Sequence, residues 1–150
     1  MKRRRRDDEG TILFLTLGLA LVLMALTVVV VDVSVVVLAK RGVSNAADGA
    51  ALLAAQQPDH AVLNDPSRRN ALATRLPLDR VQVARVVSRY QGEARGSQPT
   101  LTLTSSVGGP GNTEAVVQAR RTVRLPFVSW FGVKSVLVQA TGRARSPVAT

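Results

Sequence analysis

The side chains that could perform chemistry are few in this 150-residue chain. His60 is the single histidine, and Asp59 and Asp65 flank it in a segment punctuated by Pro58. One imidazole cannot make a histidine metal cluster, and two carboxylates in such a segment are more typical of a solvated loop than of a cation site. The sequence therefore predicts no metal site and no histidine-based catalytic group.

Motifs that mark nucleophilic or phosphate-binding enzymes are also missing from the sequence. Serines occur without a Gly-x-Ser-x-Gly elbow, and the absence of cysteine excludes disulfides and thiolate metal sites. Gly108-Gly109-Pro110-Gly111 lacks the lysine and hydroxyl of a phosphate loop and is interpreted as a hairpin loop. We expect no enzyme, no cofactor and no small-molecule substrate.

The dominant element is an uncharged run over residues 11–31. At about 1.5 Å per residue it would form about 31 Å of helix, which matches a hydrocarbon core of about 30 Å. Its only polar side chains are Thr11, Thr16 and Thr27, whose hydroxyls can bond back to the helix. An apolar surface around the whole circumference argues against a core helix of a soluble domain. The run also exceeds the roughly 7 to 15 residues of a signal-peptide core, so the pattern favours an uncleaved anchor over a cleaved signal.

The orientation follows from the basic residues that flank this run. Five lie directly before it and two, Lys40 and Arg41, follow it. The positive-inside rule places residues 1–10 in the cytoplasm and everything after the span outside it. The prediction is a single-pass cell-membrane protein whose topology is set by Lys2, Arg3, Arg4, Arg5 and Arg6.

Asp32 ends the uncharged run, and apolar residues resume after it. Two interpretations remain open, because tilt of the helix could place Asp32 at either depth. In one, the carboxylate lies solvated at the outer interface. In the other, it lies in the membrane and pairs with a partner chain.

Residues 32–57 predict an extension of the same helix outside the membrane, rich in alanine and ended by Pro58. Small residues at four-residue spacing allow close approach of helices, although an alanine-rich composition alone also produces the pattern. Two adjacent rows form this candidate packing surface: Gly42, Ala46, Ala50 and Ala54, and beside them Ala47, Ala51 and Ala55.

The order of these features resembles the N-terminal segment of Tad-type (tight adherence) Flp pilus-assembly proteins, the TadE/TadG-like group. The resemblance covers about residues 9–56. Leu15 stands where pilin-like members carry a glutamate, which places the chain nearer the TadG-like branch. Two departures from the family pattern are Ser44, near a frequent glutamine, and Gly49, at a usual alanine. The residues that carry the resemblance are Glu9-Gly10, Asp32, Lys40-Arg41 and Asn45-Ala46-Ala47-Asp48-Gly49-Ala50-Ala51-Leu52.

The resemblance implies a non-enzymatic component of a Tad-like pilus-assembly or secretion system in a bacterial cell envelope. Its partners would be other assembly proteins or further copies of the chain, contacted through Asp32, Asn45, Asp48 and the small-residue rows. Two alternatives are a generic membrane-tethered binding module and a basic surface protein that binds nucleic acid or anionic polymer. The net charge of +10 permits the second, but no aromatic platform is interleaved with the arginines, which disfavours nucleic acid.

The remainder predicts an α+β protein: the long helix, a linker and short helix over 58–79, and a small, mostly antiparallel sheet over 80–150. Asp65-Pro66 would begin the short helix, which would run to Leu76. Period-two alternation predicts four strands, near 81–90, 101–104, 117–125 and 136–145. Phe127, Trp130 and Phe131 cluster between the last two, either as a cap on the core or as an exposed patch that touches membrane or partner.

Overall fold

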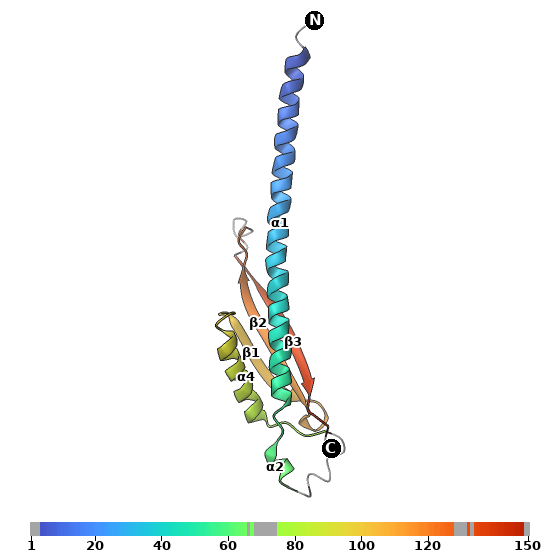
Figure 1. The fold of residues 1–150 in the computed structure, drawn as a ribbon, viewed down its shortest axis with the longest axis vertical. Helices are drawn as coiled ribbons and strands as arrows, with labels where there is room; N and C mark the ends of the chain where they lie inside the picture. The colour runs from blue at the N-terminus through green and yellow to red at the C-terminus, as the bar shows by residue number, and fades with distance from the viewer. Residues whose placement is uncertain (1–3, 66, 68–74, 128–131, 133, 149–150) are drawn as a thin grey trace.

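The computed structural model describes residues 4–65, 67, 75–127, 132 and 134–148. Its main feature is one helix, α1 (Arg4–Ala55), of 52 residues. The N-terminal half of α1 projects well beyond the rest of the molecule, and the C-terminal half packs on a sheet (Figure 1). In the described part of the chain, α1 is the one helix long and apolar enough to cross a membrane.

The apolar half of α1 keeps its few hydroxyls within the helix. Thr16 donates to the Leu13 carbonyl at 2.9 Å, and Thr27 donates to the Leu23 carbonyl at 2.9 Å. These bonds confirm, for both threonines, the predicted bonding back to the helix. The large apolar side chains of this half remain exposed, for example Phe14 at 79% and Met24 at 68%. The surface of this half is therefore apolar and largely exposed.

The sheet has three antiparallel strands, β1 (Leu101–Gly108), β2 (Glu114–Arg124) and β3 (Ser135–Arg145), in the order β1-β2-β3. A short 3-10 turn, η1 (Pro110–Asn112), joins β1 to β2, with Gly109 and Gly111 at positive φ. The glycine-rich stretch is thus a hairpin connection, as predicted. Together with α1, the sheet confirms the predicted α+β class.

The predicted strand near 81–90 is wrong, because this segment is helix α4 (Arg80–Ala94). Asp79 caps it, accepting from the backbone N–H groups of Val81 at 2.8 Å and Gln82 at 3.2 Å. Val83 and Val87 are buried on one face, at the four-residue spacing of a helix. The alternation of Val81 and Val83 imitated a strand over too short a window, and the aspartate cap outweighs it.

Between α1 and α4 the chain makes a short excursion that contains α2 (His60–Leu63), capped by Asp59. Pro58 and Leu78 form an isolated antiparallel bridge that closes this excursion at its base. Asp65 accepts from the Ser67 backbone N–H at 3.0 Å, and positions 66 and 68–74 of the predicted short helix lie outside the described residues. The predicted end of this helix at Leu76 is wrong, because Arg75 forms an isolated antiparallel bridge with Val148 and Leu76 is not helical.

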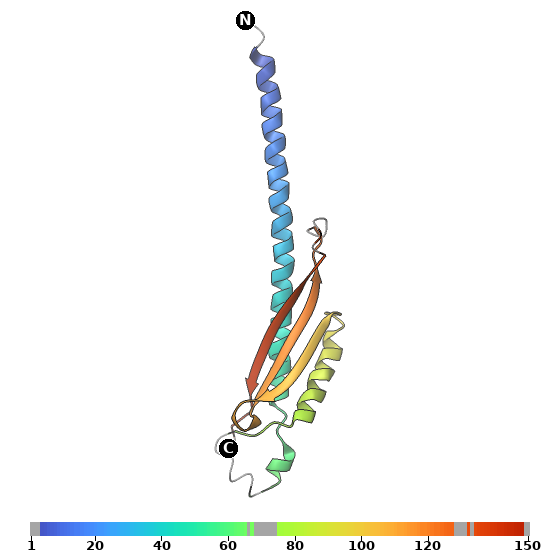
Figure 2. The ribbon, with the colours of Figure 1, turned by 180° about the vertical axis from the view of Figure 1, so that it is seen from behind.

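Both long helices cover the same face of the sheet. α1 packs on β2 and β3, α4 packs on β1, and the two helices touch each other. Gln91 of α4 also accepts the Leu103 backbone N–H at 2.9 Å, which occupies a donor on the outer edge of β1. In the part of the chain that the structure describes, no helix lies on the opposite face of the sheet (Figure 2). The core lies between the two layers, and its most buried large side chains include Val43, Val83, Leu101 and Val117.

Candidate functional site

The small-residue rows of α1 form the contact between this helix and the chain's own sheet. Apart from Gly42, which is half-buried, both rows lie buried in the core, next to Ala115, Val117 and Ala119 of β2. Short side chains on both layers allow the helix to approach the strands closely. The buried members of the rows are Ala46, Ala47, Ala50, Ala51, Ala54 and Ala55, each at most 4% exposed.

The closest approach is at Gly142 of β3, directly beneath α1. A Cβ placed there would collide with the carbonyl group of Ala47 and would come within 2.7 Å of the Asp48 backbone nitrogen. Glycine is required because backbone meets backbone at this point. The predicted alternation of β3 contained Gly142 but gave no sign of its partner.

The two glycines of α1 in this region face α4 and the turn that follows it. A Cβ on Gly49 would lie 2.9 Å from the hydroxyl of Tyr90, and one on Gly42 would lie 3.6 Å from Nε2 of Gln98. The departure at Gly49 from the family's usual alanine therefore coincides with the position of the Tyr90 side chain.

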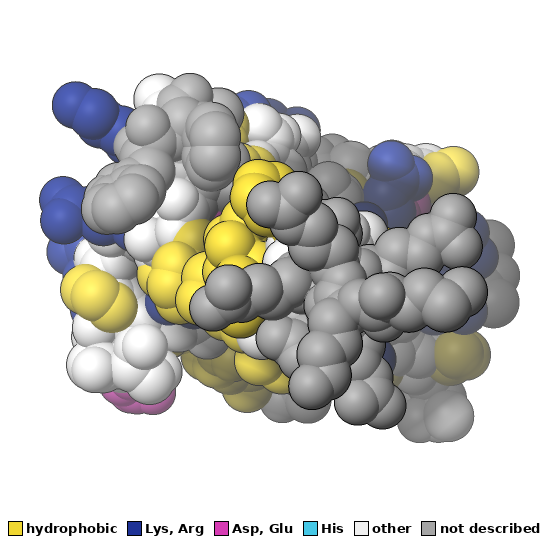
Figure 3. All heavy atoms as spheres, turned by 90° about the horizontal axis from the view of Figure 1, so that it is seen from above, with side chains coloured by type: hydrophobic (Ala, Val, Ile, Leu, Met, Phe, Trp, Pro, Cys, Tyr) yellow, Lys and Arg dark blue, Asp and Glu magenta, His cyan; other side chains and the backbone are white. Residues whose placement is uncertain are grey.

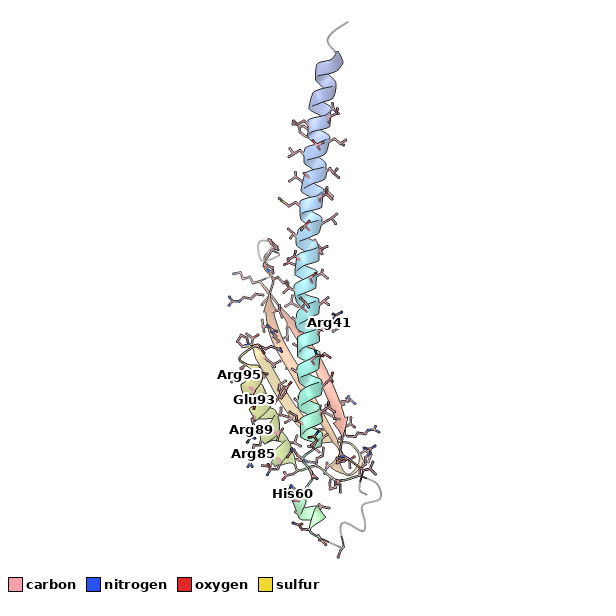
Figure 4. The ribbon with its side chains drawn as sticks, viewed as in Figure 1. Arg41, His60, Arg85, Arg89, Glu93 and Arg95 are labelled. Carbon is pink, nitrogen blue, oxygen red and sulfur yellow. The ribbon has the colours of Figure 1, made fainter. Side chains whose placement is uncertain are left out.

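The polar members of the same motif lie on the other side of the helix. Asn45 and Asp48 are exposed, Leu52 is 60% exposed, and Arg41 is exposed one turn before Asn45 (Figure 4). The motif residues are thus divided between two faces of α1. Its alanines hold the sheet, while Asn45, Asp48 and Leu52 form an outward stripe.

An open cleft of about 380 Å³ lies beside this stripe, where α1 meets the end of α4. Its lining includes Asn45, Tyr90, Glu93 and Gln98. Oε1 of Gln98 is buried without a hydrogen-bond partner. The outer side of α4 carries the exposed Arg85, Arg89 and Arg95 (Figure 4).

Asp32 lies in α1 directly after the uncharged run over residues 11–31. Its side chain is 4% exposed, and Oδ1 accepts the backbone N–H of Phe127 at 3.3 Å, from the connection that follows β2. A buried carboxylate needs such donors because removing it from water is costly. The solvated interpretation of Asp32 is wrong in this structure, since the side chain is buried and accepts the Phe127 backbone N–H. Pairing with a partner chain stays a prediction.

The remaining predicted residues are placed as follows. Arg4, Arg5 and Arg6 begin α1, whereas Lys2 and Arg3 lie outside the described residues. Of the aromatic cluster, Phe127 is 47% exposed, and Trp130 and Phe131 lie outside the described residues. His60 is exposed on α2, beyond the C-terminal end of α1 (Figure 4). Among the described residues, no group of three His, Cys, Asp or Glu side chains could hold a metal ion.

Comparison with known proteins gives one family. The family described as "Putative Flp pilus-assembly TadE/G-like" matches residues 10–57. The match covers the membrane-length run, Asp32 and the divided motif, and it confirms the resemblance predicted for this segment. No curated protein and no solved structure matches the chain.

Proposed function

We propose that this chain, which carries a TadE/G-like segment over residues 10–57, is a non-enzymatic, membrane-anchored component of a Tad-like pilus-assembly or secretion system. The N-terminal half of α1 is the anchor, residues 1–10 are cytoplasmic, and the sheet with α4 lies outside the cytoplasm. The chain acts through contacts with other assembly proteins or with further copies of itself.

The observation that carries this proposal is that the two halves of α1 expose different kinds of side chains. The half from Ile12 to Val31 exposes its large apolar side chains, which suits a lipid environment. Near its end it shares an apolar groove with Phe127. The other half uses its alanines for the domain's own core and leaves Asn45, Asp48 and Leu52 outward. Matching residues of the family segment are thus available for contacts between chains.

The test is site-specific photo-crosslinking in intact cells. A photoreactive residue at Leu52, on the outward stripe, should give adducts with envelope assembly proteins or with a second copy. The matched control is Val81, which is 64% exposed but lies on α4. Adducts at Leu52 but not at Val81 would support the proposal. An uncrosslinked monomer at Leu52, at Leu19 in the span and at Val81 would contradict it.

One observation favours a second candidate, the binding of an anionic polymer by the uncovered sheet face. Alternate residues of β2 and β3 place four exposed arginines on this face: Arg120, Arg124, Arg143 and Arg145. Binding through these arginines would weaken steeply with salt because each neutralised anion releases counterions. Retention of the full chain, in detergent, on a heparin column at 0.05 M but not 0.5 M salt, lost in Arg120→Gln with Arg143→Gln, would support it.

A further inference from the structure

Phe127, which follows β2, lies beside the apolar half of α1. Figures 1 and 2 both show this end of the sheet rising along α1, above the level of β1. Phe127 lies next to the helix there, and it lines an open groove of about 310 Å³ with Met24, Thr27, Val28 and Val31. The bond from the Phe127 N–H to Asp32 fixes this position.

The groove presents only apolar chemistry. Among its described lining residues Thr27 is the one polar side chain, and its hydroxyl is already engaged with the Leu23 carbonyl. A ligand that occupied the groove would find hydrocarbon walls and no unsatisfied donor or acceptor among these side chains. This lining suits an alkyl chain.

The depth of the groove follows from the proposed span, on which this inference rests. With the span over residues 11–31, a rise of about 1.5 Å per residue places Met24 about 10 Å inside the outer end of the span. Phe127 therefore lies beside the outermost third of the hydrocarbon layer. The ring of phenylalanine carries no polar atom, so it suits hydrocarbon at this depth.

Two basic residues flank the connection between β2 and β3 on its sheet side. Arg124 and Lys134 are both exposed. Arg124 pairs with Ser135 at the last register of the β2–β3 ladder, so Arg124 and Lys134 lie together at the end of the sheet that leads to Phe127. We assign this level to the headgroup layer beyond the hydrocarbon. Long basic side chains at this level can reach phosphate while their alkyl stems follow apolar surface. Viewed down α1, hydrophobic side chains gather around the helix and basic ones lie toward the margins (Figure 3).

We propose that Phe127, which follows β2, forms a second membrane contact of the chain. The groove between Phe127 and α1 holds an acyl chain of a phospholipid in the bilayer that α1 spans, and Arg124 and Lys134 face the phosphate headgroups. The membrane would then hold the outer domain at two points, α1 and Phe127. Two points of contact restrict the orientation of the domain to the membrane.

Tryptophan depth measurements test this proposal on the full chain. The chain has a single tryptophan, so a Trp130→Phe background allows one reporter to be placed at each chosen site. The variants are Phe127→Trp at the groove, Leu21→Trp in the span, and Leu52→Trp on the exposed extension. Each is reconstituted in phosphatidylcholine–phosphatidylglycerol vesicles that contain lipids brominated at shallow or deep acyl positions.

The expected result is loss of Phe127→Trp fluorescence with shallow bromines, loss of Leu21→Trp fluorescence with deep bromines, and no loss for Leu52→Trp. Unquenched Phe127→Trp beside quenched Leu21→Trp would overturn the lipid contact and leave the anchor standing. If the fluorescence of Leu21→Trp is not quenched, both the proposed membrane anchor and the proposed lipid contact are wrong. Circular dichroism of each variant confirms that it is folded.

The headgroup contact has its own matched control. Arg124→Gln with Lys134→Gln should reduce the gain in Phe127→Trp quenching that phosphatidylglycerol gives over phosphatidylcholine alone. Arg143→Gln with Arg145→Gln, at the far end of β3, should leave that gain unchanged. An equal effect of both pairs would overturn the assignment of Arg124 and Lys134 to the headgroups.

Discussion

Gly142 of β3 lies against the backbone of Ala47 in α1 so closely that no side chain fits between them. This contact fixes the height of the helix on the sheet. The alanines before and after Ala47 share the same interface, and the sheet contributes Ala115 and Ala119. The small-residue rows of α1 are thus used within the chain.

Gly142→Ala should destabilise the outer domain by about 1–3 kcal/mol, the usual cost of forcing extra volume into a packed interior. The measurement is thermal unfolding of the detergent-solubilised chain followed by circular dichroism. Gly92→Ala on α4 is the control, because a Cβ there meets nothing within 4 Å. It should be neutral or stabilise by up to about 1 kcal/mol. Equal stability of the two variants would contradict the close contact at Gly142.

Gly49→Ala should be almost neutral, because two effects oppose each other. Alanine favours the helix by about 1 kcal/mol over glycine, while the new Cβ displaces the tip of Tyr90. In Tyr90→Phe the nearest atom, the hydroxyl oxygen, is gone, so Gly49→Ala should then stabilise the chain more. A double-mutant cycle in chemical denaturation measures the difference. A coupling of zero would mean that the Tyr90 hydroxyl does not restrict this position.

Asp32→Ala should release Phe127 from α1. Removal of the acceptor leaves the Phe127 N–H without its carboxylate, at a cost of about 1–3 kcal/mol if the group stays buried. Hydrogen–deuterium exchange at the Phe127 amide should become faster. Ser34→Ala is the control, since Ser34 is exposed and its hydroxyl bonds only locally, to the Val30 carbonyl. Unchanged exchange in Asp32→Ala would show that the bond is not retained in solution.

Two substitutions on α1 should separate folding from assembly. Ala50→Leu inserts volume at a fully buried position and should cost about 1–3 kcal/mol of stability. Asp48 lies on the outward stripe, so Asp48→Ala should change the free energy of unfolding by no more than about 0.5 kcal/mol. If the stripe contacts partners, Asp48→Ala should nevertheless reduce the Leu52 crosslink. Full retention of that crosslink in a stable Asp48→Ala protein would remove Asp48 from the contact.

The structural features that the sequence predicts correctly depend on short, continuous stretches of residues. The length and uniform apolarity of residues 11–31 predict a spanning helix, and the alternation in β2 and β3 predicts strands. The alternation of Val81 and Val83 predicts a strand where the chain forms α4. The Asp79 cap and the four-residue spacing of Val83 and Val87 indicate the helix. The cap was present in the sequence and could have identified the helix.

The contacts that define the candidate site join residues far apart in the sequence, so no short pattern predicts them. Asp32 and Phe127 are 95 residues apart, and their meeting depends on the height of the sheet along α1. A row of alanines suits a neighbouring chain and the chain's own sheet equally well, because both require only close approach. The choice between these depends on Gly142 and the strands around it, which no pattern within α1 can show.

The most direct measurement concerns the placement of α1 across the membrane. The chain has no cysteine, so Asp8→Cys and Gln139→Cys each create a single thiol, one before the span and one on the exposed face of β3. A membrane-impermeant maleimide applied to intact cells, with the outer membrane opened where there is one, should label Gln139→Cys at once. It should label Asp8→Cys only after the inner membrane is permeabilised. Labelling of both thiols in intact cells, or the reverse order, would contradict a spanning helix with the sheet outside the cytoplasm.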